Sequence, residues 1–493
     1  MGVIKRQSIL STTYTYMGVV LGFITTALLF SKYLTPSENG LLKLLVSYST
    51  IFAQFANLGI NAVAIRFFPF FRNEDKKNHG LLFLLFSVLL VGFILFLAVF
   101  LILSPTLIQS NKADSPLFVD YLYFIIPLTF FTLLFGSLDV FYRGLFKSTV
   151  GAFLKEFAQR TFIFVFILLY IFDIINFHWF VIFYCVALSL PTVILLILLV
   201  KDKHFHLKPD FSIIDKPMAR QMVQVALFGL ITGFGNIAIL NIDSIMVNQY
   251  TNTALTGIYA ITSYFGILVS IPSRAFLRIG STVIAQAHKE NDLKTIDEVY
   301  KKSCLNQFII GLLLFLGLIV NLENIFLILP PDYAAGKYVI IFIGLSHLSV
   351  MATGANTIII GSSKFYKANA YAVMALLALT VITNIIFIPR YGISGAAFAS
   401  VLSMCLFNVI EYIVIYVKFS LQPYNYKFIL IVIFGVVTYG IMYYVPSSAN
   451  LYLNIAWLST LTIILFMGPV LLLKISPDIN ALFAKGISLL KNR

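Results

Sequence analysis

Several arginines lie inside or at the end of long apolar stretches of this sequence. Arg274 and Arg278 are four residues apart, so a helix would place both on one face. Arg160 lies one to two turns into another apolar stretch, and Arg66 ends an earlier one. A planar guanidinium fork suits phosphate oxygens, so these arginines are candidates to bind a diphosphate. The alternative is that each side chain extends its head to the aqueous boundary, which we favour for Arg66 and Arg143.

Two carboxylates also lie within apolar stretches. Asp243 has Asn236 and Asn241 nearby, and Glu411 lies well inside a later stretch. A charge at the centre of a membrane helix costs about 2.5–3.5 kcal/mol and usually faces a cavity or a partner. Both residues are candidates for ion or proton coupling. The alternatives are that Asp243 pairs with a neighbouring helix or caps a turn, and that Glu411 only joins helices together.

Neutral polar residues form a third set. Gln54, Asn57 and Asn61 are spaced by three and four residues, which gives a polar stripe on one helical face. Such a stripe could contact sugar hydroxyls, and hydrogen bonding between helices explains it equally well.

Motifs of enzymes and metal sites do not occur in a suitable context. We find no Gly-rich phosphate loop and no nucleophile elbow. His204 and His206 lie in a basic loop, where solvated side chains explain them better than a metal site does. The three cysteines are isolated and lack metal or disulfide spacing. The sequence therefore predicts neither an enzyme nor a cofactor, and it contains no ATP-binding domain that could drive transport.

The elements that carry these residues are long and apolar. The sequence is 60% hydrophobic and 11% charged, whereas soluble domains carry about 25% charged residues. A helix needs about 20 apolar residues to cross a bilayer. We therefore predict an all-α polytopic membrane protein with about fourteen transmembrane helices, the first of them retained and not cleaved as a signal peptide. The predicted helices are residues 8–34, 41–70, 81–103, 118–141, 150–172, 179–200, 221–249, 256–285, 304–322, 338–361, 368–388, 394–417, 428–445 and 453–474.

The positive charges predict the orientation of these helices. An even number of helices puts both termini on one side of the membrane. If that side is the cytoplasm, few of the 34 Lys and Arg residues fall on the other side. This asymmetry favours cytoplasmic termini, because positive residues are retained on that side. The exceptions are Lys32, Lys43, Lys112, Lys337 and Arg390.

A repeated pattern predicts two related halves. Tyr33 is followed seven residues later by Gly40, and Tyr250 is followed in the same way by Gly257, each pair at the start of an apolar stretch. We predict two six-helix lobes in parallel repeat, plus an appended helix pair. The predicted divisions are an N-terminal lobe at 1–200, a cytoplasmic linker at 201–220, a C-terminal lobe at 221–417, appended helices at 418–474 and an amphipathic cytoplasmic tail at 475–493.

Three stretches carry a resemblance to a known superfamily. They are LLFSKYLTPSENGLLKLLVSYS at 28–49, NIDSIMVNQYTNTALTGIYAITSYF at 241–265 and FIPRYGISGAAFAS at 387–400. Together with two lobes and an added pair, they resemble the multidrug/oligosaccharidyl-lipid/polysaccharide exporter superfamily. Within it, the chain looks like the polysaccharide transporter branch, the Wzx-type flippases of O-antigen, lipopolysaccharide and capsule synthesis.

The resemblance implies a function and a location. It implies alternating access in a bacterial cytoplasmic membrane, with translocation of undecaprenyl-diphosphate-linked oligosaccharide repeat units. Partners would be membrane lipids and the lipid-linked substrate, with a polysaccharide polymerase and a chain-length regulator as further candidates, and no nucleic acid. Ile261, Thr262 and Ser263 stand where the lipid II branch tends to place an arginine, which argues against lipid II as the substrate. The alternatives are a cation-coupled multidrug exporter of the same superfamily and a transport-inactive scaffold of a polysaccharide assembly complex.

Overall fold

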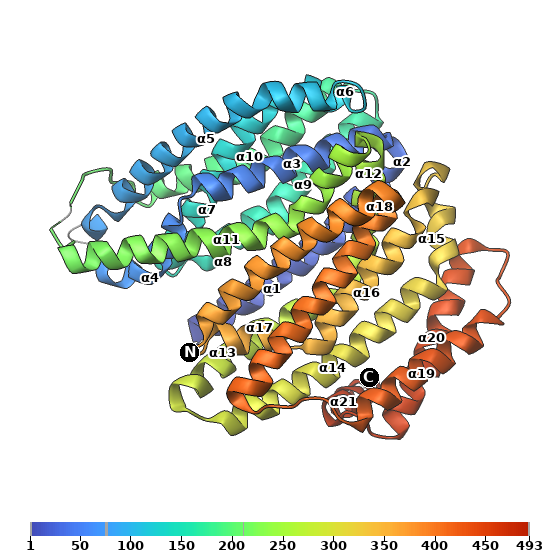
Figure 1. Ribbon diagram of the computed structural model, residues 1–493. Helices are drawn as coiled ribbons and strands as arrows, with labels where there is room; N and C mark the ends of the chain where they lie inside the picture. Colours follow the sequence, from blue (N-terminus) through green and yellow to red (C-terminus); the bar gives the residue numbers. More distant parts are fainter. Residues whose placement is uncertain (1, 74–76, 211, 492–493) are drawn as a thin grey trace. The chain divides into compact units, whose positions relative to one another are not determined.

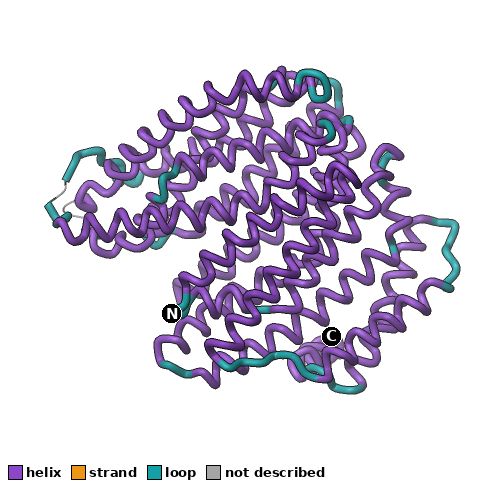
Figure 2. The backbone as a smooth tube through the Cα atoms, viewed as in Figure 1, coloured by secondary structure: helices purple, strands orange, loops and turns teal. Residues whose placement is uncertain are grey.

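The computed structural model describes residues 2–73, 77–210 and 212–491, and all regular secondary structure in them is helical. Figures 1 and 2 show these helices and the loops that join them. The all-α prediction is confirmed. By packing, the chain divides into two compact units, Met1–Ile261 and Thr262–Arg493. We call them unit 1 and unit 2, and each is described by itself.

In unit 1, α3 lies centrally and packs against α5, α7 and α11, while α10 packs against α7 and α9. Two π-helical turns, η1 and η4, interrupt the first and fifth predicted helices. The elements are α1 (Gly2–Gly22), η1 (Phe23–Phe30), α2 (Ser31–Tyr33), α3 (Pro36–Ala56), α4 (Ile60–Phe71), η2 (Lys77–Gly80), α5 (Leu81–Asn111), α6 (Pro116–Asp120), η3 (Leu122–Phe124), α7 (Ile125–Gly144), α8 (Ser148–Ala152), η4 (Phe153–Ala158), α9 (Gln159–Ile171), α10 (Phe177–Lys201), α11 (Lys216–Tyr250) and the first part of α12 (Thr253–Ile267).

In unit 2, α16 packs against both α14 and α18, and the appended helices α19 and α20 pack against α14. Gly392 has φ 56° and ψ −137°, so it breaks α18 into two helices, as predicted from the sequence. The elements that follow α12 are η5 (Leu268–Ser270), α13 (Ile271–Glu290), α14 (Leu293–Val320), α15 (Leu322–Ile328), η6 (Pro331–Gly336), α16 (Lys337–Thr353), α17 (Asn356–Gly361), α18 (Tyr366–Phe419), α19 (Tyr426–Tyr443), α20 (Leu451–Leu472) and α21 (Pro477–Lys491).

The predicted count of fourteen membrane helices is only roughly confirmed. By length and composition, 11 helices in the described residues can cross a membrane, or 12 if the bent pair α3 and α4 forms one span. Two features explain most of the difference. Lys367–Phe419 passes as one helix although Gly392 divides it. The fifth predicted helix is split into α8, η4 and α9, and it carries several charges.

The bend between α3 and α4 was not predicted. The sequence suggested one helix over 41–70, whereas the two helices meet at 51°. Leu58 and Gly59 both have positive φ, 49° and 75°, and Asn57 ends α3. This break lies within an apolar run, so hydropathy alone does not reveal it.

A close crossing joins the two copies of the Tyr-x6-Gly pattern. A Cβ atom at Gly40 in α3 would overlap the carbonyl oxygen of Thr253, which begins α12. A Cβ atom at Gly257 in α12 would likewise overlap the carbonyl oxygen of Pro36, which begins α3. Both positions must therefore be glycine for the two backbones to approach this closely.

The polar connections are shorter than predicted. Residues 287–303 were expected to form a connection, but α13 continues to Glu290 and α14 starts at Leu293. Asp292 caps α14 by accepting a hydrogen bond from the backbone of Thr295 at 3.0 Å. In the 201–220 segment, α11 already begins at Lys216. Helices thus continue into polar sequence, where hydropathy cannot detect them.

The units and the predicted lobes divide the chain differently. α11, which the repeat assigns to the second half, packs against α3 and α4 of unit 1. The lobe boundaries therefore stay a prediction. So does the interfacial position of the tail, where the structure contains α21.

Candidate functional site

Five charged side chains gather on α7, η4 and α9 of unit 1. We call them the charged cluster, and they comprise Asp139, Arg143, Lys155, Glu156 and Arg160. Arg143 Nε lies 3.1 Å from Asp139 Oδ2, and Arg160 Nη2 lies 3.2 Å from Glu156 Oε2. Because three are cationic and two are anionic, the cluster has an excess positive charge. An anionic group that enters a membrane protein needs cationic partners, and this cluster can supply them.

Arg160 is held in place by two different elements. Besides its ion pair with Glu156, its Nη1 donates a hydrogen bond to the carbonyl oxygen of Gly18 in α1 at 2.6 Å. A Cβ atom at Gly18 would overlap the carbonyl oxygen of Glu156, so α1 and η4 are in close contact here. The guanidinium group therefore fastens α1 to η4, and its remaining N–H groups can still donate to an oxyanion.

Lys155 occupies the centre of the charged cluster. Its side chain is partly buried, and the charges of Glu156, Arg160 and Asp139 all act on it. Its ammonium group also lies 5.2 Å from the ring centroid of Phe135. The π-helical turn η4 inserts one extra residue per turn and so changes which side chains face α7; such turns often occur at functional sites. Of this cluster, the sequence indicated Arg143 and Arg160. It missed Asp139, which the four-residue spacing to Arg143 could have revealed.

The other predicted arginines lie on other elements. Arg66 in α4 is exposed and lies 6.0 Å from the ring centroid of Phe67. Arg274 in α13 of unit 2 is also exposed, close enough to His347 of α16 for its charge to act on the imidazole. The side chain of Arg278 lies outside the described part of the chain. A diphosphate role for these three arginines therefore stays a prediction.

The polar stripe of α3 and α4 makes contacts within unit 1. Asn57 Oδ1 accepts a hydrogen bond from the backbone N–H of Asn61 at 3.3 Å and so stabilises the bend. Asn61 Oδ1 accepts one from Ser137 Oγ of α7 at 2.6 Å. The Gln54 amide lies against Gly233 of α11. These contacts favour the interhelical alternative, and the sugar-contacting role is still untested.

Asp243 has polar partners in unit 1. Tyr259 donates a hydrogen bond from its hydroxyl to Asp243 Oδ2 at 3.1 Å, so α12 contacts α11 here. The carboxylate also acts electrostatically on Lys43 of α3, a helix that packs directly against α11. Tyr259 lies in the 241–265 stretch that carries the resemblance, two residues after Gly257. Lys43 is far from Asp243 in the sequence, and only the packing of α3 on α11 brings it near.

Glu411 lies in the second part of α18 and is only 1% exposed. Thr357 of α17 donates a hydrogen bond from Oγ1 to Glu411 Oε2 at 3.0 Å. The other carboxyl oxygen, Oε1, is buried and has no hydrogen-bond partner. No ion pair of Glu411 occurs among the described residues. Its surroundings are thus very different from those of Asp243.

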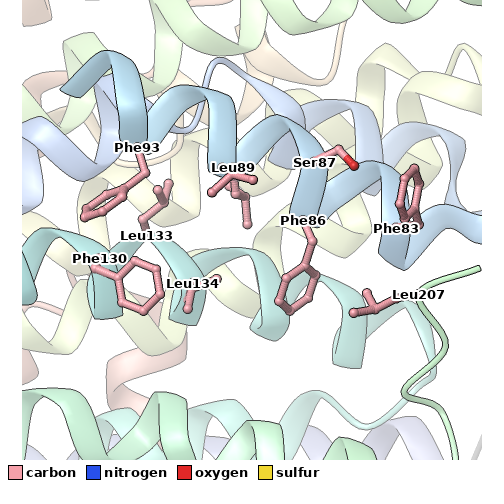
Figure 3. Close-up of a pocket in the computed structure, with 10 residues that line it drawn as sticks. Phe83, Phe86, Ser87, Leu89, Phe93, Phe130, Leu133, Leu134 and Leu207 are labelled. Atoms are coloured by element: carbon pink, nitrogen blue, oxygen red, sulfur yellow. The ribbon is translucent and has the colours of Figure 1, made fainter. Parts of the chain in front are cut away.

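An apolar cavity of about 360 Å³ lies between α5 and α7 of unit 1 (Figure 3). Four phenylalanines line it, namely Phe83, Phe86 and Phe93 of α5 and Phe130 of α7, and Leu207 from the α10–α11 connection closes one end. Ser87 is the one polar side chain in this lining. Without charged groups the cavity cannot bind a diphosphate, but it is compatible with a hydrocarbon chain.

Two solved structures share this fold. A lipid II flippase MurJ in an inward closed conformation is 15% identical, with a TM-score of 0.72, over 93% of this chain and 97% of that one. An inward-facing multidrug resistance MATE family transporter of the MOP superfamily is 11% identical, with a TM-score of 0.64, over 84% and 98%. At these identities the similarity concerns the fold alone. It confirms a fold shared by multi-pass membrane transporters.

A sequence-level comparison carries the family assignment. No curated protein matches the chain. A family model described as polysaccharide biosynthesis protein matches residues 4–284, more than half of the chain. The predicted resemblance to the polysaccharide branch is thereby confirmed, and the chain belongs to the polysaccharide biosynthesis protein family.

Proposed function

We propose that this protein is a flippase that translocates undecaprenyl-diphosphate-linked oligosaccharide repeat units across a bacterial cytoplasmic membrane by alternating access. The units would belong to an O-antigen, a capsule or an exopolysaccharide. Family membership and the transporter fold support this proposal. The observation that carries it is the charged cluster, because an excess of cationic groups in a membrane protein suits a diphosphate.

The proposal assigns roles to the candidate residues. Lys155 and the free N–H groups of Arg160 would bind the diphosphate in unit 1. Arg274 and Arg278 would bind it in another stage of the cycle, and Arg66 would attract it at the membrane boundary.

Both termini would be cytoplasmic, as the distribution of Lys and Arg favours. The lipid tail would remain in hydrocarbon, for which the α5–α7 cavity is suitable. A polymerase and a chain-length regulator are proposed partners.

Deletion of the gene tests the function. We expect loss of the surface glycan together with accumulation of one diphosphate-linked oligosaccharide in lipid extracts. The wild-type gene should restore the glycan, and Lys155→Met should not. Lys112→Met is the matched control, because Lys112 is an exposed lysine outside the charged cluster. Unchanged glycan with increased sensitivity to cationic drugs would favour the multidrug exporter. Loss of glycan without an accumulated intermediate would favour the scaffold.

A second test concerns the arginines of unit 2. The double variant Arg274→Ala and Arg278→Ala should abolish glycan export while the protein still inserts into the membrane, as measured by the amount of protein in washed membranes. Full export by this variant would remove both arginines from the diphosphate site. The assignment to Lys155 and Arg160 would then be tested by their own variants.

A further inference from the structure

Glu411 is a buried carboxylic acid with no basic side chain among its described partners. It is 1% exposed, it accepts one hydrogen bond from Thr357, and its Oε1 has no partner. An ionised carboxylate in such a place loses its hydration and gains no cation in return. The neutral acid loses far less. The conformation in the structure is therefore one in which Glu411 carries its proton.

The described groups around Glu411 do not supply a compensating charge. Tyr300 of α14 is close enough to interact with the Glu411 carboxyl electrostatically, and Cys304, Tyr412 and Tyr424 surround Tyr300 in turn. Tyrosine and cysteine side chains are not cationic in either protonation state, so none of these groups can pair with a carboxylate as a cation. Further along the chain, Ile415 belongs to a buried apolar cluster that also contains Tyr300 and Cys304. On the α17 side, Thr357 supplies a hydroxyl group but no charge.

The contact of α16 and α17 with α18 is polar along much of its length. Asn408 of α18 donates to Ser349 Oγ at 2.9 Å and accepts from Thr353 Oγ1 at 3.4 Å. Thr357 and Glu411 continue this row of polar side chains. The residue before Thr357, Asn356, is buried, and both of its amide atoms lack a hydrogen-bond partner. Native proteins rarely leave such groups unpaired, so these amide atoms would gain hydrogen bonds if water reached them.

We propose that Glu411 is the proton-carrying group of this transporter. It holds a proton while α17 and α18 are in contact, and it exchanges that proton with water when the contact opens. This inference rests on the proposed function, because only a transporter cycle would open and close the contact. In an exporter whose substrate leaves the cytoplasm, a proton bound on the outer side and released on the inner side would drive the movement.

Infrared spectroscopy of the purified, full-length protein tests the protonation directly. We expect the carbonyl band of a protonated carboxylic acid at neutral pH in the wild-type protein, and its loss in the isosteric variant Glu411→Gln. The control is Asp243→Asn, which should leave this band unchanged, since Asp243 is near Lys43. Absence of the band from the wild-type protein would overturn the inference. So would disappearance of the band on addition of NaCl alone, because it would identify a sodium site.

A second experiment separates this inference from the proposed function. In the deletion strain, Glu411→Gln should insert into the membrane in normal amounts and fail to restore the surface glycan. Complete restoration by Glu411→Gln would overturn proton coupling at this residue and leave the flippase intact. If deletion of the gene does not affect any surface glycan, the proposed function fails, and the infrared result still decides whether Glu411 carries a proton.

Discussion

Asp243 in unit 1 and Glu411 in unit 2 are both carboxylates within membrane-spanning helices, but their surroundings differ. Asp243 accepts a hydrogen bond from Tyr259 and acts on the charge of Lys43. Among the described residues, Glu411 has a single hydroxyl donor and no cation. The first arrangement stabilises an ionised group and joins three helices, whereas the second requires a neutral acid. A charged residue in a membrane helix is therefore interpretable only together with its partners.

The largest expected effect comes from displacing α12, the helix from which Tyr259 donates its hydrogen bond to Asp243. Gly257→Val should prevent α12 from crossing α3, because the new side chain would overlap the carbonyl oxygen of Pro36. We expect loss of folded protein, measured as the monodisperse fraction in detergent. Gly440→Ala in α19 is the control. No atom lies within 4 Å of its added Cβ, so stability should be unchanged or should rise by up to about 1 kcal/mol. A folded Gly257→Val protein would contradict the close crossing.

Next in size is the removal of the Asp243 charge. Asp243→Asn leaves Lys43 partly buried without its counter-charge, so we expect a destabilisation of about 1–3 kcal/mol, below the range for fully buried pairs. The measurement is the thermal unfolding midpoint of the purified protein. The double variant Asp243→Asn and Lys43→Met should recover most of the loss. If the two single effects simply add, the residues do not interact.

Glu411→Gln should change stability by less than about 1 kcal/mol, because an amide resembles the neutral acid in shape and charge. The same unfolding assay compares it with Asp243→Asn. Thr357→Val should cost about 1 kcal/mol through loss of the hydroxyl donor. A destabilisation by Glu411→Gln as large as that by Asp243→Asn would mean that Glu411 is ionised and paired in the folded protein.

The smallest effect concerns a carboxylate outside the membrane. Lys147 donates a hydrogen bond to Asp202 Oδ2 at 2.8 Å, which holds the pKa of Asp202 below its usual range. A carboxyl whose folded pKa is lowered adds stability above its unfolded pKa of about 3.9. That stability is lost as the pH falls through the lower folded pKa. We expect a contribution below about 1 kcal/mol. Asp202→Asn should flatten this part of the pH profile of the unfolding midpoint, and an unchanged profile would contradict the pairing.

The sequence singles out the charged residues but not their partners. Arg160, Asp243 and Glu411 stand out because each interrupts an apolar run. Their partners Gly18 and Thr357 are distant in the sequence, and only tertiary packing brings them close. A backbone carbonyl or a lone threonine carries no signal of its own. The sequence thus provides a list of candidate residues and not their contacts.

The fold shows the same limit. Hydropathy located most of the predicted helices, since each must cover the hydrocarbon core. It missed the bend at Leu58 and Gly59, where the run stays apolar while the backbone changes direction. It also ended helices too early wherever the chain becomes polar, as at Glu290 and Leu293.

The crossing of α3 and α12 has a consequence for the history of the chain. If the two halves descend from one duplicated gene, Gly40 and Gly257 are copies of a single ancestral glycine, and each now lies against the other copy's helix. Mutations elsewhere could then remove the sequence similarity of the two halves. A side chain gained at either glycine, however, would overlap the backbone of the helix that carries the other glycine. The Tyr-x6-Gly pattern would therefore be retained because each glycine must stay small for the other copy's helix to pack, whatever substrate the protein carries.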